Sequence, residues 1–289
     1  MKFINHKSIS SIEKIILFFL NVFAFIRAKN VIRILVYHNI ESKHILKFKH
    51  QLKSLKKDWN FISAKEFEDH IKKKKILKGR NLLITFDDGF KSNYFIAKKI
   101  LKNLEIKAIF FVPSDFIKIK SKSNTKKFIE KNILDNQKIK NQNKLKNMTP
   151  KDLKFLIKNG HTIGNHTKTH ADLGAIKKKI KLKREILNSA KDLENILNVK
   201  INHFAYTYGN YNNMSFDSLK IALSKHHYVY SCFRGNNYFN KEHDIIKRDT
   251  IYLNSSNDLL KIFLSGFLDL KYFLDKIRVN KMIIKILNK

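Results

Sequence analysis

Two clusters of polar side chains have the residue types and spacing expected for metal-assisted hydrolysis. Asp87 and Asp88 follow the apolar run "LLITF" and precede a glycine. His166 and His170 are four residues apart in "GNHTKTH", directly behind another short β-type run. Two imidazoles and one carboxylate form a ligand set that leaves open positions on a divalent metal. Together the clusters predict a metal centre of the hydrolytic type.

Each cluster alone has an ordinary interpretation, because Asp-Asp-Gly is a common turn and a single histidine is more often structural. The pair is more specific. Consecutive residues after a strand point in different directions, so Asp88 can bind the metal while Asp87 faces the water and acts as its base. The metal would neutralise one of the two carboxylates and so make their proximity tolerable.

The two motifs resemble those of a known family. "TFDDG" and "HTKTH" are similar to the motifs of polysaccharide deacetylases of the chitin-deacetylase and nodulation-deacetylase type (NodB homology, carbohydrate esterase family 4), over about residues 32–265. The resemblance implies that Asp87 is the general base and that the metal ligands are Asp88, His166 and His170. Zinc is the expected ion, although this ligand set would also take other first-row divalent ions.

A branch that includes poly-N-acetylglucosamine deacetylases is closer still, since its general acid comes from the beginning of the domain. "LVYHNI" resembles that element, which makes His38 the candidate acid that protonates the leaving amine. The alternative is a histidine that only caps the first strand.

Two further segments resemble the same branch. "FAYTYG" is similar to "FAYPYG", whose backbone after the proline supplies an oxyanion donor. The equivalent donor here is the Tyr208 N–H, although Thr207 replaces the proline and lacks its fixed φ. "KRDTI" matches a late strand that carries an arginine, so Arg248 is expected to orient Asp87. The alternative is a surface salt bridge between Arg248 and Asp249 or a neighbour.

These residues need a scaffold, and the chain alternates short apolar runs with amphipathic stretches. The pattern predicts an α/β fold, a distorted (β/α) barrel of about seven parallel strands with terminal amphipathic or apolar helices. The expected strands are 33–38, 82–86, 107–112, 161–166, 203–207, 227–232 and 245–253. The expected helices are 45–57, 64–75, 92–103, 149–159, 174–198 and 215–225.

Three segments fall outside this alternation. Residues 117–147 are rich in Lys and Asn without a sustained apolar face, which predicts an exposed insertion within a deacetylase domain of residues 31–265. Residues 1–30 contain the apolar, lysine- and arginine-flanked run Ile15–Ile26, which at 12 residues is shorter than the roughly 20 needed to span a bilayer. A helix lying in the membrane interface is favoured there over a signal anchor or a helix packed on the domain.

Residues 266–289 are predicted to form a basic amphipathic tail. The lysine-rich part after Leu270 is expected to contact an anionic leaflet rather than cover the core.

The 59 basic and 24 acidic side chains give a formal charge of +35, which suggests phosphate-bearing or membrane partners, or simply a solvated surface. Arginine-rich clusters with interleaved aromatics are absent, so nucleic acid is not an expected partner. A single cysteine excludes an internal disulfide and is compatible with the cytosol.

The resulting hypothesis is a metal-dependent de-N-acetylase that hydrolyses the acetamide of an N-acetylated amino sugar. The favoured substrate is lipid-linked, for example undecaprenyl phosphate N-acetylgalactosamine, in lipopolysaccharide, lipid A or envelope glycan modification. The alternatives are a poly-N-acetylhexosamine of the cell surface and a catalytically inactive basic protein that binds membranes or nucleic acid. The expected location is the inner membrane on its cytoplasmic face, or else an anchored form that faces the periplasm or exterior.

Overall fold

The computed structural model describes residues 30–134, 145–251, 253 and 255–288, without the side chains of residues 257 and 258. The apolar run Ile15–Ile26 lies outside the described residues, so its membrane role stays a prediction. Within the described part of the chain, no helix is both long and apolar enough to cross a bilayer.

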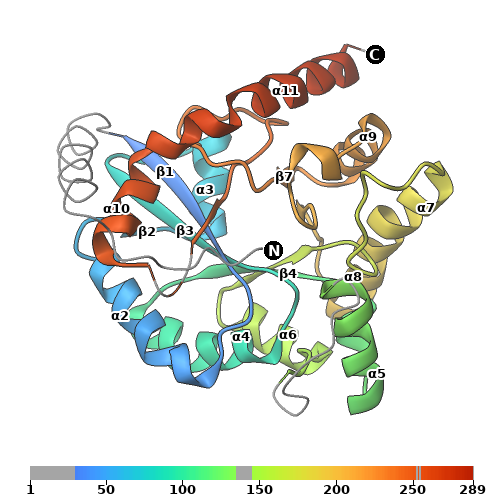
Figure 1. Cartoon of the computed structure of the whole chain (residues 1–289), viewed down its shortest axis with the longest axis horizontal. Helices are drawn as coiled ribbons and strands as arrows, with labels where there is room; N and C mark the ends of the chain where they lie inside the picture. The colour runs from blue at the N-terminus through green and yellow to red at the C-terminus, as the bar shows by residue number, and fades with distance from the viewer. Residues whose placement is uncertain (1–29, 135–144, 252, 254, 289) are drawn as a thin grey trace, which may run out of the picture.

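Parallel strands form the centre of the molecule, and helices surround them (Figure 1). The strands run in the order β7-β6-β5-β4-β3-β1-β8, and the short β2 pairs with β3 beside this path. Their bounds are β1 Val31–Tyr37, β2 Asn60–Phe61, β3 Arg80–Phe86, β4 Ala108–Val112, β5 Thr162–Asn165, β6 His203–Ala205, β7 Tyr228–Tyr230 and β8 Asp249–Thr250.

Residues 246–250 bring the two ends of this sheet together. Ile246 forms a parallel bridge with Tyr230 at the end of β7, and Asp249 pairs with Leu35 of β1. The predicted distorted (β/α) barrel is therefore confirmed, with an irregular last strand of which only two residues pair as β8. The short β2 was not anticipated from the sequence.

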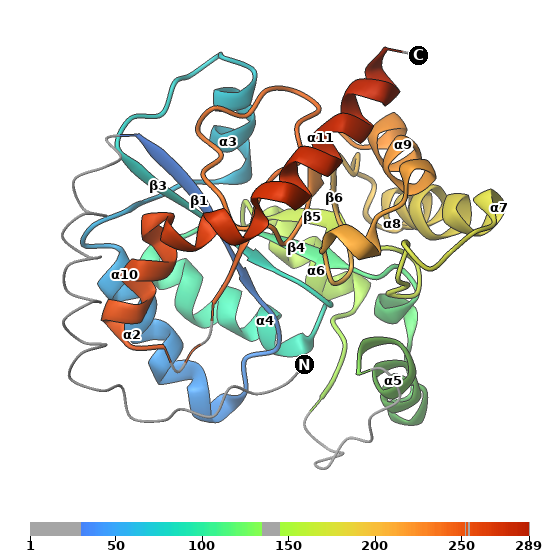
Figure 2. The same cartoon turned by 45° about the horizontal axis from the view of Figure 1, so that its top comes forward.

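The helices follow the strands and cover the outside of the sheet (Figures 1 and 2). Local signals start several of them: α3 begins with a capping box of Ser63 and Glu66, and α6 with Thr149 as N-cap and Pro150 in its first turn. The expected helix 174–198 starts only at Lys179. The bounds are α2 Ile45–Leu55, α3 Ala64–Ile71, α4 Lys91–Ile96, α6 Pro150–Lys158, α7 Lys179–Lys183, α8 Ser189–Leu197 and α9 Phe216–Lys225, with π turns η2 Ala97–Leu101 and η6 Arg184–Asn188.

Alternate strand residues build two apolar clusters. One joins one face of the strands to α2, α4 and α6, and includes Tyr37 and Phe86. The other joins the opposite face to α3, and includes Phe111 and Tyr230. All seven residues of β1 are buried, as expected for a parallel strand that is covered on both faces.

The expectation that residues 117–147 lack an apolar face is wrong for the described part of that segment. It forms α5 Lys122–Phe128 and the π turn η5 Ile129–Ile133, which α5 continues into. Ile129 is fully buried in a small cluster with Phe90 and Phe116. A few apolar side chains are enough to hold this segment, because it packs on one side alone. Its many polar residues therefore hid the apolar side in the sequence.

The C-terminal region forms α10 Asn257–Ser265, the 3-10 turn η8 Phe267–Tyr272 and α11 Phe273–Leu287. Gly266 separates α10 from η8 with a φ of +90°, a conformation that favours glycine. The expectation that the tail after Leu270 does not cover the core is wrong, because Val279 and Ile283 of α11 are buried in an apolar cluster with α9. Lysines and exposed apolar residues such as Leu274 and Ile284 occupy the rest of the helix, so the sequence pattern did not show which side packs on the core.

Candidate metal centre and active site

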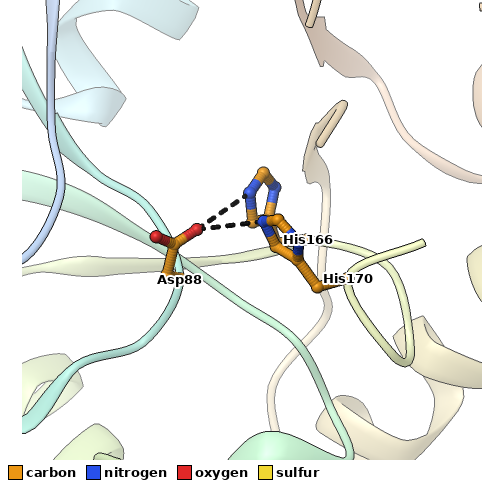
Figure 3. A group of neighbouring side chains, drawn as sticks. All are labelled: Asp88, His166 and His170. Atoms are coloured by element: carbon orange, nitrogen blue, oxygen red, sulfur yellow. Dashed lines mark ion pairs between the residues drawn. The ribbon is translucent and has the colours of Figure 1, made fainter. Parts of the chain in front are cut away.

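Asp88, His166 and His170 converge from the ends of β3 and β5, and all three side chains are buried (Figure 3). The Asp88 Oδ1 atom lies 3.2 Å from Nε2 of His170 and 3.6 Å from Nε2 of His166. One ligand atom from each residue can be chosen so that all lie within 4.8 Å of one another. This donor set and spacing fit a divalent transition metal such as zinc.

Backbone carbonyls hold both imidazoles so that Nε2 faces the carboxylate. The Nδ1 atom of His166 lies 2.8 Å from the Ala205 oxygen, and the Nδ1 atom of His170 lies 2.8 Å from the Asn132 oxygen. A carbonyl can only accept, so each Nδ1 carries the proton and each Nε2 lone pair is available for a metal. Both imidazole rings are therefore in the tautomer that metal binding through Nε2 requires.

Arg248 binds Asp87 through both guanidinium nitrogens. Its Nη1 donates to Asp87 Oδ1 at 2.7 Å and its Nη2 to Oδ2 at 2.9 Å, and both side chains are buried. Burial is the largest single influence and opposes ionisation of Asp87. The charge and hydrogen bonds of Arg248, together with the nearby His166 and His38, outweigh it and lower the pKa of the carboxyl group below its ordinary value. Asp249, the alternative partner in the sequence, pairs with Arg33 instead.

Several site residues adopt an unusual backbone conformation. Asp88, Thr167, His170 and Tyr208 all have φ between +61° and +71°. Non-glycine residues in this left-handed region each cost of order 1–3 kcal/mol, and such strain gathers at functional sites. The motif loops are thus held in shapes that the rest of the fold must stabilise.

Glu185 stabilises the loop between the two histidines. Its Oε2 accepts hydrogen bonds from the backbone nitrogens of Lys168 and Thr169, at 3.0 and 2.9 Å, and its Oε1 accepts one from the Thr169 hydroxyl. The carboxylate is buried in η6 and satisfies N–H groups that the turn leaves unpaired.

The rim loop after β6 carries Tyr208 against the metal-site candidates. Its ring meets that of His170 edge to face, with centroids 5.4 Å apart. Thr207 is buried, and its hydroxyl donates to the carbonyl of Ala171, next to His170 in the chain. A proline at position 207 could not make this bond, so the threonine ties two rim loops together.

His38 is exposed in the loop that follows β1. Its imidazole is within electrostatic range of the site, because it is among the smaller influences that lower the pKa of Asp87, after Arg248 and His166, and that of Asp88, after His166 and His170. Several other histidines have structural partners. His203, for example, bonds Glu68 and Tyr230, and His161 accepts from the backbone of Ala108.

The sequence did not reveal Glu185 or the Asn132 and Ala205 carbonyls as parts of the site. Every residue has a carbonyl, so no residue type marks the last two. Glu185 lies 15 residues beyond His170 without a recognisable motif around it. The sequence did bring together Asp87, Asp88, His166 and His170, and the structure also places Arg248 and Tyr208 beside them.

The family model described as "Polysaccharide deacetylase" matches residues 74–225, just over half of the 289 residues. The matched region contains both metal motifs and Tyr208, whereas His38 and Arg248 lie outside it. No curated protein matches the sequence.

Solved structures share the fold. IcaB from Ammonifex degensii is 19% identical, with a TM-score of 0.62 over 83% of this chain and 97% of its own. The Streptococcus pyogenes deacetylase PplD, solved with acetate, is 20% identical, with a TM-score of 0.62 over 82% and 99%. A de-N-acetylase from Aggregatibacter actinomycetemcomitans is 17% identical, with a TM-score of 0.64 over 81% and 100%.

Proposed function

We propose a specific reaction for this chain, which belongs to the polysaccharide deacetylase family and is thus a de-N-acetylase that hydrolyses carbon–nitrogen bonds. It removes acetate from an N-acetylated amino sugar bound at the Asp88, His166 and His170 centre. The observation that carries this proposal is the Asp87–Arg248 pair beside those three ligands. It supplies an ionised, oriented carboxylate where a hydrolytic water must be activated.

A metal held by the three ligands, zinc in our proposal, would polarise the acetamide carbonyl and acidify the attacking water. Asp87 takes a proton from that water, and Arg248 keeps its carboxylate ionised and aimed. The Tyr208 N–H donates to the oxyanion that forms when the water oxygen bonds the acetyl carbon. His38 then protonates the sugar nitrogen as the carbon–nitrogen bond breaks, which leaves acetate and a free amine.

We propose a lipid-linked amino sugar as the substrate. The support comes from η8 and α11, where Phe267, Leu270, Phe273, Leu274, Ile277, Ile284 and Leu287 are between 37% and 75% exposed. Lysines and one arginine lie along the same helix, so the surface suits an anionic leaflet. Arg278 of α11 also stacks on Tyr211, three residues beyond Tyr208, so the helix reaches the rim loop of the site.

The same surface supports a location at the membrane, with the cytoplasmic face favoured because the chain needs no disulfide. Cosedimentation with vesicles of anionic phospholipid tests this location. The double variant Leu274→Glu/Ile277→Glu should lose binding, whereas exposed Ile180→Glu, remote in the chain, should retain it. Equal binding by both variants would contradict the location without affecting the chemistry.

Acetate release tests the activity, with wild type measured beside Asp87→Asn. Undecaprenyl-phosphate N-acetylgalactosamine and N-acetylglucosamine oligomers should be offered in parallel. Release from the lipid-linked sugar alone supports the proposal, and release from the oligomers alone supports a polymeric cell-surface substrate instead. Release from neither would support the alternative of an inactive binding protein. Equal release by the variant would overturn Asp87 as the base and with it the proposed active site.

A further inference from the structure

The whole segment between β4 and α6, which contains the insertion, contacts both motif loops of the metal centre. At its beginning, the backbone nitrogens of Ser114 and Asp115 donate to the carbonyls of Thr167 and Lys168, at 3.2 and 3.0 Å. Its far end pairs with the loop after Asp88, where the Met148 nitrogen donates to the Gly89 oxygen at 2.8 Å. The insertion is therefore anchored on both halves of the site.

The helical part of the insertion also reaches a candidate ligand directly. Asn132 lies at the C-terminal end of η5, and its carbonyl accepts from Nδ1 of His170 at 2.8 Å. Carbonyls in the last turn of a helix have no partner within the helix, and they form the negative end of its dipole. Such a group both fixes the proton on Nδ1 and favours positive charge on the imidazole when Nε2 binds a cation.

The two histidines differ in the origin of this support. The carbonyl that orients His166 belongs to Ala205 in β6, a buried strand of the barrel. The carbonyl that orients His170 belongs to a segment held by a small separate cluster, in which Ile129 contacts Phe90 and Phe116. The ring of Phe128 stacks on that of Phe116, with centroids 4.8 Å apart.

Polar contacts fix the same segment. The Thr125 hydroxyl donates to the side-chain oxygen of Asn147 at 3.0 Å, and the Asn147 amide donates to the Phe116 carbonyl at 2.9 Å. Both side chains are buried. These bonds connect α5 to the two chain segments that anchor the insertion, so a shift of α5 or η5 would move the Asn132 carbonyl.

We infer that residues 122–134 are a positioning element for the metal, which sets metal affinity through the Asn132 carbonyl and is itself stabilised when the metal binds. The inference rests on the proposed role of His170 as a ligand. Loss of a carbonyl or carboxylate behind a metal-bound histidine typically weakens binding 10- to 100-fold. Because coupling free energies are reciprocal, bound metal must stabilise the segment by the same factor.

The first test measures Zn²⁺ affinity of the full chain by competition with a chromophoric chelator. Ile129→Asp should detach the segment and raise the Kd about 10- to 100-fold. Asn132→Gly keeps the carbonyl but frees its backbone, and it should give a smaller increase. The matched control is Lys120→Ala, an exposed residue just before this segment that should bind Zn²⁺ like the wild type.

The second test follows amide hydrogen exchange of the wild type with and without Zn²⁺. Zinc should slow exchange in peptides that cover residues 129–134 and leave those of α2 unchanged. Wild-type affinity in a folded Ile129→Asp variant, or unchanged exchange in residues 129–134, would overturn the inference. If Ile129→Asp does not fold, Asn132→Gly decides in its place.

A third variant separates this inference from the proposed function. His170→Ala should itself lose Zn²⁺ affinity if His170 is a ligand. Unchanged affinity in His170→Ala would refute the ligand set as a whole, and with it the inference. Lost affinity in His170→Ala with full affinity in the segment variants would refute the positioning role alone.

Discussion

Arg248 and Asp87 form a two-pronged ion pair, with both N–H···O distances below 3.0 Å and both side chains removed from solvent. The arginine comes from the strand segment that closes the barrel, and the aspartate follows β3. This pairing helps to explain how a carboxylate removed from water stays ionised. Burial alone would raise the pKa of Asp87, and the guanidinium is the largest of the influences that together lower it instead.

Arg248→Gln should therefore raise the pKa of Asp87. The acid limb of the kcat/KM pH profile reports the pKa of the base in the free enzyme. This limb should therefore move to higher pH, and kcat/KM should fall ~10²-fold or more. Arg248→Lys keeps a charge but not the paired geometry, and should lie between wild type and Arg248→Gln. An unshifted acid limb in both variants would mean that Asp87 is not the base.

The same pair makes stability depend on pH. A carboxyl group whose pKa is lowered by folding contributes stability that is fully present above its ordinary pKa of about 4. That contribution is lost as the pH falls through the lowered pKa of the folded protein. Urea unfolding between pH 7 and pH 3 should show a smaller acid-induced loss in Arg248→Gln than in wild type, on top of a lower stability at pH 7 by about 3–5 kcal/mol.

His38→Ala should lower kcat by about 10²- to 10⁴-fold, because the departing nitrogen would lose its proton donor. The basic limb of the pH profile should disappear, while Zn²⁺ content stays at the wild-type level. His227→Ala, an exposed histidine with no proposed role, serves as the control. Full activity of His38→Ala would leave the capping of the first strand as its function.

Chelation should abolish acetate release, and added Zn²⁺ should restore it. His166→Ala and His170→Ala should purify with little metal, whereas His161→Gln should retain it, since His161 only accepts from the backbone of Ala108. Metal analysis of the purified proteins checks this ordering. Turnover that resists a strong chelator would contradict the proposed centre.

Glu185→Ala should weaken Zn²⁺ binding although Glu185 is not itself a candidate ligand. Its carboxylate holds the backbone nitrogens of Lys168 and Thr169, so its loss leaves donors unpaired in a strained loop. We expect a 10- to 100-fold higher Kd for zinc and a stability loss of about 1–3 kcal/mol. Glu194→Ala provides a comparison, because that carboxylate also accepts from a backbone nitrogen, that of Ile201, but lies outside the motif loops. Equal Kd values would assign Glu185 to stability alone.

Thr207→Val should destabilise the rim by about 1–2 kcal/mol, because valine has a similar shape but cannot donate to the Ala171 carbonyl. Thermal unfolding measures this loss. Zn²⁺ affinity should also fall, since Ala171 follows His170 directly. An unchanged melting temperature would show that water replaces the hydroxyl without penalty.

The sequence predicted the barrel well because its strands are buried on both faces and so appear as short apolar runs between turns. Asp87, Asp88, His166 and His170 were found from their residue types and spacing. Arg248 and Tyr208 came only from resemblance to a family branch, because nothing in "KRDTI" or "FAYTYG" itself requires a nearby active site. In the structure both lie beside the four motif residues.

The misses have physical causes. In residues 122–134 a few apolar side chains, chiefly Phe128 and Ile129, hold a helix onto the barrel amid many lysines and asparagines. In α11 Val279 and Ile283 are buried while other apolar residues, such as Leu274 and Ile284, are exposed, so the pattern did not show which apolar face packs on the domain. Average composition therefore concealed two helices that pack on the core. The Asn132 carbonyl could not be found at all, because its position depends on how the insertion folds.

The closing strand has a consequence for the order in which the protein acquires its parts during folding. The Asp87–Arg248 pair joins residues 161 apart in the sequence, and the adjacent Asp249 joins Arg33 over 216 residues. Contacts of such long sequence separation form slowly, because the chain must first lose much of its entropy. The candidate metal ligands, which follow β3 and β5, are closer in sequence. A refolding chain should thus be able to bind its metal before it acquires an oriented base, so metal binding should precede activity in time.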